Sequence, residues 1–106
     1  MEWIDDCAKC LDNGLYPHSL IRIRECCERG LKAQGPDRLA AYVIRSITAE
    51  LLRDWDDRAL QVDETHHAEK ELVPALRSVL GALREGAPPA TVAERLDLLV
   101  QVWAAL

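Results

Sequence analysis

The residues best suited to chemistry in this sequence are four cysteines near its beginning. Cys7 and Cys10 form a Cys-x-x-Cys pair, and Cys26 and Cys27 follow after fifteen intervening residues. Two thiolate pairs at such a spacing are typical of structural zinc sites, in which each pair supplies two tetrahedral ligands. Adjacent residues on a helix, however, point about 100° apart, so Cys26 and Cys27 are poorly placed to bind one metal ion. The spacing therefore gives only weak support for a metal site.

Core packing is the preferred interpretation of these cysteines, because a free Cys on an apolar helix face behaves as a small hydrophobic residue. We predict that Cys7 and Cys27 are buried between the first two helices, with Cys10 and Cys26 nearer the edge of that interface. A hairpin of these helices would bring Cys7 close to Cys27, which keeps two alternatives open. These are a metal site that uses Cys7, Cys10 and Cys27, and thiol redox chemistry within the whole set.

A second candidate for metal chemistry is the pair Glu64 and His67, which form a Glu-x-x-His motif. This spacing directs a carboxylate and an imidazole from one helix toward a di-iron centre. Such a centre needs two of these motifs and two further glutamates, so a dimer would have to complete it, with Glu50 as an added ligand. We favour a solvated helix start instead, because acidic residues are stabilised there. Glu64, His66 and His67 are expected to be exposed and to bind no metal in the monomer, and no cofactor is expected.

Other patterns that would indicate an enzyme are absent from the sequence. It contains no Gly-rich phosphate loop and no nucleophile elbow. His18 stands alone beside Pro17, and the serines have no neighbouring base. We therefore expect a protein without catalytic activity.

Charge is concentrated in one segment of the chain, residues 54–71. The net charge of the chain is −5. Seven acidic residues lie in the segment, against the two bases Arg58 and Lys70: Asp54, Asp56, Asp57, Asp63, Glu64, Glu69 and Glu71. The segment therefore carries the whole net charge. Because phosphate binding requires Lys and Arg, nucleic acid is not expected as a direct ligand.

An aromatic residue beside a field of one sign is a common composition for a partner surface, with the ring as anchor and the charges steering the approach. Trp55 lies directly before Asp56 and Asp57, so the acidic segment is predicted to face a partner protein with a basic surface. The alternative is a solvated loop whose Trp packs inward. The apolar run 102–106 is more than one helix face can bury, which favours a homodimer or a partner helix. The candidate partner-binding residues are Trp55, Asp56, Asp57, Asp63, Glu64, Trp103 and Leu106.

Apolar residues recur at helical spacing through nearly the whole chain, which predicts the elements that position these residues. Helices are expected over 2–12, 17–34, 36–55, 64–85 and 91–106, joined by short loops that favour antiparallel neighbours. The fold class is thus all-α, a four- or five-helix antiparallel bundle that forms a single domain over residues 1–106. Apolar residues make up 49% of the chain, with no Phe, so Leu, Val, Ile and Ala must build the core.

Three local features refine the predicted helices. Residues 56–63 lack helical periodicity and are expected to form a loop. Pro74 removes a helix hydrogen bond, so we expect a bend near Lys70 or a new helix start near Val73. Thr91 and Glu94 have the spacing of a capping box at the start of the last helix. Leu39 is expected to widen the apolar face of the third helix.

The chain begins without a signal-peptide pattern, and its longest apolar run is the six residues 39–44. A membrane span needs roughly 20 such residues. We therefore expect a cytoplasmic protein with reduced cysteines and no membrane partner. By elimination, the predicted function is a small protein–protein interaction module: an adaptor, an inhibitor or an assembly subunit. The alternative is a metal-binding or thiol-sensing helical bundle.

Overall fold

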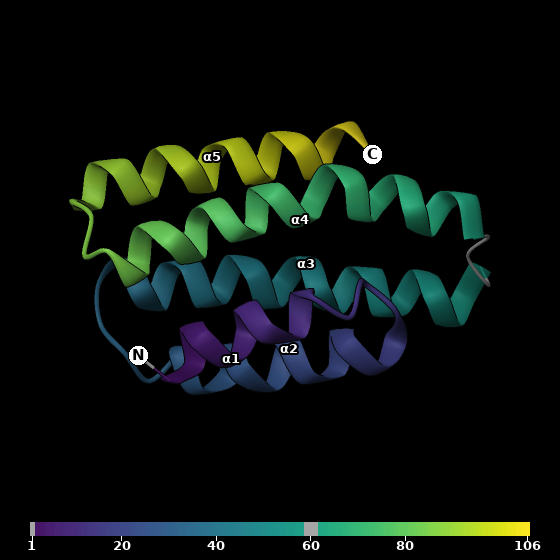
Figure 1. Cartoon of the computed structure of the whole chain (residues 1–106), viewed down its shortest axis with the longest axis horizontal. Coiled ribbons are helices and arrows are strands. Elements are labelled where there is room, and N and C mark those ends of the chain that lie inside the picture. Colours follow the sequence, from purple (N-terminus) through teal and green to yellow (C-terminus); the bar gives the residue numbers. More distant parts are fainter. Residues whose placement is uncertain (1, 59–61) are drawn as a thin grey trace.

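Amphipathic sequences over most of the chain fold into five helices in the computed structural model, which describes residues 2–58 and 62–106 (Figure 1). For residues 57, 58 and 62 only the backbone is described. Consecutive helices run in opposite directions (Figure 1), and the described residues contain no strand. The predicted all-α bundle is therefore confirmed, in its five-helix form. The helices are α1 (Glu2–Leu11), α2 (Pro17–Gly30), α3 (Pro36–Arg58), α4 (Val62–Arg84) and α5 (Pro89–Ala105).

The core consists of aliphatic residues that recur three or four positions apart on each helix. On α4 these include Leu72, Leu76 and Val79, and on α5 they include Leu96 and Leu99, all of them buried. The α2 helix makes its most extensive contacts with α3, while α4 pairs mainly with α5. The two groups of helices therefore share one apolar interior. No helix in the described part of the chain is both long and apolar enough to cross a membrane.

The turn between α1 and α2 is held against the other half of the bundle by two long-range hydrogen bonds. The backbone N–H of Leu15 donates to Glu69 Oε1 over 3.0 Å, and the indole N–H of Trp55 donates to the Leu15 carbonyl over 3.2 Å. Gly14 precedes this point with a φ of 80°, a conformation that favours glycine. A Cβ at Gly14 would lie 2.6 Å from Glu69 Oε1. Glycine is thus required here both for the backbone conformation and for the close approach of Glu69.

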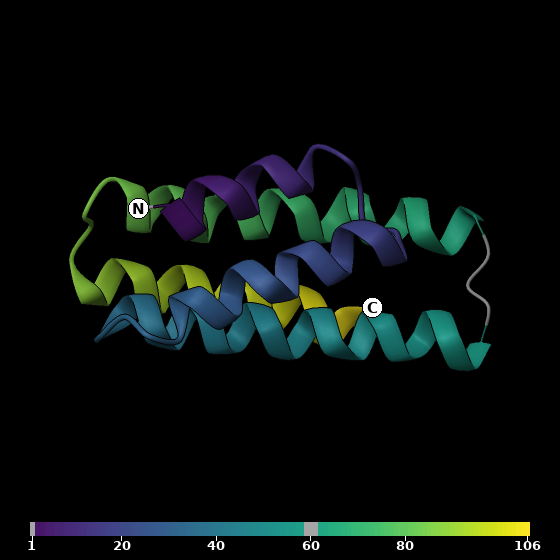
Figure 2. The same ribbon diagram turned by 90° about the horizontal axis from the view of Figure 1, so that it is seen from below.

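The pair of long helices α3 and α4 projects beyond the rest of the bundle. Seen from two perpendicular directions, the ends of α3 and α4 nearest their connection extend past α5 and past the α1–α2 turn (Figures 1 and 2). Residues 56–58 continue α3, and α4 already begins at residue 62, so the predicted loop over 56–63 is wrong for the described residues. Its residues 59–61 lie outside them. Polar residues can extend a helix without apolar periodicity when the added turn faces water, and Asp63 and Glu64 stabilise the α4 N-terminus.

The α4 helix runs without interruption through Pro74, so a new helix start near Val73 is wrong. The prediction assumed that a helix ends where proline removes one of its hydrogen bonds. Pro74 is exposed, however, and the carbonyl that loses its partner can be hydrated on that side of the helix. Of the two expectations, a bend within one helix is the one compatible with a continuous α4.

Two further local predictions are corrected by the structure. The capping box of Thr91 and Glu94 does not form, because α5 begins earlier, with Pro88 at the N-cap and no side-chain capping bond. Proline at the first helical position already has a helical φ and needs no donor partner. Leu39 is 53% exposed rather than part of the buried face of α3.

The second helix is also shorter than predicted. It ends at Gly30 rather than just before Gly35. The N–H groups of Lys32 and Ala33 bond carbonyls only three residues back, which tightens the chain out of the α-helix.

Candidate functional site

The four cysteines gather at the interface of α1 and α2. Cys7 and Cys27 are fully buried, and Cys10 is partly exposed, as predicted. Cys26 is buried as well, with 5% of its surface exposed, but it lines the surface cavity beside Cys10 and so lies nearer the edge than Cys7 and Cys27, as predicted. The Arg29 side chain, one helical turn further on, contacts the Cys26 sulfur.

Burial helps to raise the pKa of Cys7, Cys10 and Cys26 above the usual value for a thiol. A hydrogen bond between the Cys7 and Cys27 side chains, with burial as the second cause, raises the pKa of Cys7 far above its usual value. The sequence-based expectation that these two residues meet is therefore confirmed. Burial raises the pKa of Cys10, although its hydrogen bond with Cys26 acts in the opposite direction. Burial also raises the pKa of Cys26, to about 11, against the effect of a hydrogen bond from Arg29. At neutral pH, Cys7, Cys10 and Cys26 are consequently neutral thiols.

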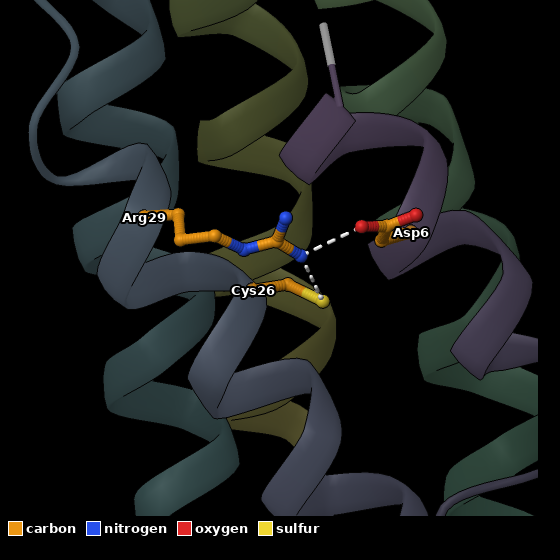
Figure 3. Close-up of polar contacts among 3 residues, drawn as sticks. All are labelled: Asp6, Cys26 and Arg29. Atoms are coloured by element: carbon orange, nitrogen blue, oxygen red, sulfur yellow. Dashed lines mark hydrogen bonds and ion pairs between the residues drawn. The ribbon is translucent and has the colours of Figure 1, made fainter.

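Arg29 connects the two helices at the outer edge of this cluster (Figure 3). Its Nη2 atom donates to Asp6 Oδ2 over 2.8 Å and to Cys26 Sγ over 3.4 Å. The same region forms an open surface cavity of about 480 Å³. Its lining combines the two outer thiols with three cations and two acids: Cys10, Cys26, Lys9, Arg22, Arg29, Asp6 and Glu25.

Replacement of Cys27 by Ala should lower the free energy of unfolding by about 1 kcal/mol, because a fully buried sulfur loses its packing contacts. Urea denaturation followed by circular dichroism measures this change. Cys10→Ala is the matched control, and it should cost less because Cys10 is partly exposed. A larger loss for Cys10→Ala than for Cys27→Ala would contradict the assignment of Cys27 to the core.

A second site lies where the end of α5 meets the projecting part of α3 and α4. A cavity of about 350 Å³ is lined there by Leu51, Asp54, Glu64, His67, Ala68, Trp103 and Leu106. Three residues predicted to bind a partner (Glu64, Trp103 and Leu106) are thus brought together, although Glu64 lies about forty residues before the other two in sequence. Glu64 and His67 are exposed, as is His66, which confirms that part of the prediction.

This cavity continues along the groove between α4 and α5. A neighbouring cavity of about 390 Å³ shares His67 and Leu106 and adds Glu71 and Val102. Trp103 is held in place because its indole N–H donates to Glu50 Oε2 over 3.2 Å. Leu106 is 45% exposed at the rim. The two cavities thus form one acidic and apolar groove, which we call the α4–α5 groove.

The remaining predicted partner residues lie around this groove rather than inside it. Trp55 is half-buried, with its ring 5.8 Å from that of Tyr16 and its N–H bonded to Leu15. Its role as a partner anchor stays a prediction. Asp56 and Asp63 are exposed, and the side chain of Asp57 lies outside the described part of the chain.

Sequence reasoning did not name Leu51, Ala68 or Gln101, which line the groove, as partner-facing residues. It included Asp54 only as part of the acidic segment 54–71. A signal for Leu51 was available, because Leu51 and Asp54 are three apart on one helix and are therefore neighbours on its surface. Their position opposite Trp103 depends on how α3, α4 and α5 pack, which no local pattern encodes.

Within the ranges 2–58 and 62–106, no group of three or more His, Cys, Asp or Glu side chains is arranged to hold a metal ion. The two sets considered for metal binding are also separate. The set Cys7, Cys10 and Cys27 lies between α1 and α2, whereas Glu64 and His67 lie on α4. The structure therefore does not combine them into one site.

Comparison of the chain with protein families, with curated proteins and with solved structures finds no match.

Proposed function

We propose that this chain is a non-enzymatic protein–protein interaction module that binds a cationic, partly apolar segment of another protein in the α4–α5 groove. The observation that carries the proposal is the lining of the groove, which combines acidic side chains with exposed apolar ones. Exposed apolar surface rimmed by polar side chains is a feature of interaction sites.

The chemistry of the groove favours Lys and Arg as the partner's contact residues. Leu51, Ala68 and Trp103 offer an apolar surface on which the methylene stem of a Lys or Arg side chain can pack. Asp54 and Glu64 lie where the charged head group would end. Both carboxylates also interact within the chain, so attraction depends on the local excess of negative charge rather than on unpaired groups.

The distribution of charge supports the same kind of partner. The segment 54–71 carries the whole net charge of −5 and supplies the three acids that line the groove, Asp54, Glu64 and Glu71. A field of one sign accelerates the approach of an oppositely charged partner and repels nucleic acid. We place this activity in the reducing cytoplasm, where the four cysteines stay thiols. A homodimer through residues 102–106 would cover the same groove and would therefore compete with such a partner.

Binding of a cationic amphipathic peptide tests the proposal directly. The probe is a fluorescent helical peptide with Lys and Leu on one face, and the measurement is fluorescence anisotropy over a range of salt concentrations. We expect the double variant Asp54→Asn/Glu64→Gln to bind about tenfold more weakly, equivalent to about 1.4 kcal/mol. We also expect binding by the native chain to weaken as salt rises, since exposed charges are screened beyond about 8 Å at physiological ionic strength.

A matched control separates the groove from a general charge effect. Glu85→Gln/Glu94→Gln removes two exposed acids near the α4–α5 connection, at the other end of the bundle, and should leave the affinity nearly unchanged. The indole N–H signal of Trp103 should shift in NMR spectra on peptide addition, while that of Trp3, buried in α1, should not. Equal losses in the two double variants, or a Trp103 signal that stays in place, would refute the groove as the binding site.

A further inference from the structure

We propose that Cys10 and Cys26 form a reversible dithiol/disulfide pair, and that the cations of the adjacent surface cavity recruit an anionic low-molecular-weight disulfide as its co-reactant. The site is separate from the α4–α5 groove, because it lies between α1 and α2 at the cavity that Arg29 borders (Figure 3). The proposal therefore does not depend on the interaction function.

The first support is the pairing of the sulfurs across the helix interface. Cys10 on α1 and Cys26 on α2 share a side-chain hydrogen bond, so each sulfur already faces the other. A disulfide of about 2.05 Å requires the two side chains to move together from this contact. The inner pair, Cys7 and Cys27, shares a similar contact but is buried, with at most 1% of either residue exposed. Only the outer pair has a member, Cys10, that solvent reaches.

The second support is the charge of the cavity beside this pair. Lys9, Arg22 and Arg29 line the cavity together with both sulfurs. Arg29 is partly neutralised by its ion pair with Asp6, whereas no ion pair is recorded for Lys9 or Arg22 among the described residues. Together with Glu25, the lining sums to three positive and two negative charges. Cations beside a thiol attract anionic reactants and stabilise the thiolate that attacks them.

The exchange proceeds in two balanced steps. Cys10 loses its proton to solvent, and its thiolate attacks one sulfur of the disulfide R–S–S–R. The R–S–S–R bond breaks, and RS⁻ leaves and takes up a proton. Cys26 then loses its proton and attacks the Cys10 sulfur, which expels the second RS⁻. In sum, the two protein thiols lose two electrons and two protons, and the small disulfide is reduced to two thiols.

The protonation of the thiols sets the speed of this reaction. Burial raises the pKa of Cys10 and of Cys26, so little thiolate is present at neutral pH, despite the opposing influence of Arg22 on Cys10 and of Arg29 on Cys26. The carboxylate of Asp6 also raises the pKa of Cys10, and Glu25 lines the same cavity. Below the pKa of Cys10 the rate should therefore rise about tenfold per pH unit, in proportion to the thiolate fraction. The Cys10–Cys26 pair should therefore oxidise slowly, and a brief exposure to the small disulfide should oxidise little of it.

The experiment compares oxidation of the reduced full chain by an anionic probe, glutathione disulfide, and a neutral one, 2-hydroxyethyl disulfide. Mass spectrometry follows the loss of two hydrogen atoms, and peptide mapping locates the bond. We expect a Cys10–Cys26 disulfide, faster with the anionic probe. Lys9→Gln/Arg22→Gln should lower the anionic-to-neutral rate ratio several-fold, whereas Arg53→Gln/Lys70→Gln, which removes two exposed cations on α3 and α4, should not.

Single variants separate the roles of the two thiols. Cys26→Ser should stop the reaction at a mixed disulfide on Cys10, and Cys10→Ser should slow all modification by at least tenfold. A bond between Cys7 and Cys27, or first attack at Cys26, would overturn the pairing. If the Lys9/Arg22 variant leaves the anionic-to-neutral rate ratio unchanged, the cavity does not recruit the anionic disulfide. Peptide binding in the α4–α5 groove reads out the interaction function independently of either result.

Discussion

Replacement of Trp55 by Ala is expected to lower the free energy of unfolding by about 2–3 kcal/mol, somewhat less than for a fully buried tryptophan. Trp55 is half-buried against Tyr16, and its N–H satisfies the carbonyl of Leu15 in the α1–α2 turn. The substitution removes the ring contact and leaves that carbonyl without this partner. Urea denaturation measures the loss, and peptide anisotropy under native conditions tests whether binding changes with it.

Trp55→Phe is the matched variant, since it keeps an aromatic ring beside Tyr16 and removes only the indole donor. It should cost about 1 kcal/mol, the usual net value of one hydrogen bond. If Trp55→Ala is as stable as the native chain but binds the peptide more weakly, Trp55 belongs to the partner surface instead. The two substitutions thus decide between the two interpretations of this residue that the sequence leaves open.

Replacement of Gly30 by Ala is expected to destabilise the protein by about 1–3 kcal/mol, although Ala favours helices more than Gly does. Gly30 is the last residue of α2, and a Cβ there would lie 2.8 Å from the Cβ of Ala41 and 2.8 Å from the ring of Trp3. Both neighbours are buried, so neither can move aside freely. Thermal and urea denaturation should both show the loss.

Gly81→Ala provides the opposite result within the same protein. Gly81 lies inside α4, and a Cβ there would meet no atom within 4 Å beyond the helix's own backbone. The substitution should stabilise the protein by about 0.5–1 kcal/mol, because Ala loses less conformational entropy in a helix. If Gly30→Ala also stabilised the protein, the close contact of α2 with α1 and α3 would be disproved.

The helices themselves could be predicted from the sequence because burial imposes a period on it. The apolar positions of α4 and α5 recur every three or four residues, and those at Leu72, Leu76, Val79, Leu96 and Leu99 are buried. Helix ends were harder to predict. The end of α3 at Arg58 lies beyond its last apolar residues, where no apolar pattern marks it, and α4 continues through Pro74 because the carbonyl that loses its partner can be hydrated on the exposed side of the helix.

The two sites differ in how much of each could be foreseen. The Cys7–Cys27 contact followed from a hairpin of two adjacent helices, which is a local inference. The contact of Arg29 with both Asp6 and the Cys26 sulfur did not, because it depends on how side chains are arranged across the α1–α2 interface. The α4–α5 groove required the packing of three helices. Glu64, Trp103 and Leu106 were chosen for separate reasons, and only the tertiary structure places them around one cavity.

The two hydrogen bonds at Leu15 can form only late in the synthesis of the chain. Its N–H is bonded to a side chain 54 residues later, and its carbonyl to one 40 residues later. The α1–α2 turn therefore leaves the ribosome before Trp55 and Glu69, which fix it, have emerged. Until Glu69 emerges, the hairpin must persist through its own interface alone, and that interface contains the four thiols. The interval of translation between the two events is the period in which these cysteines are least protected from oxidation.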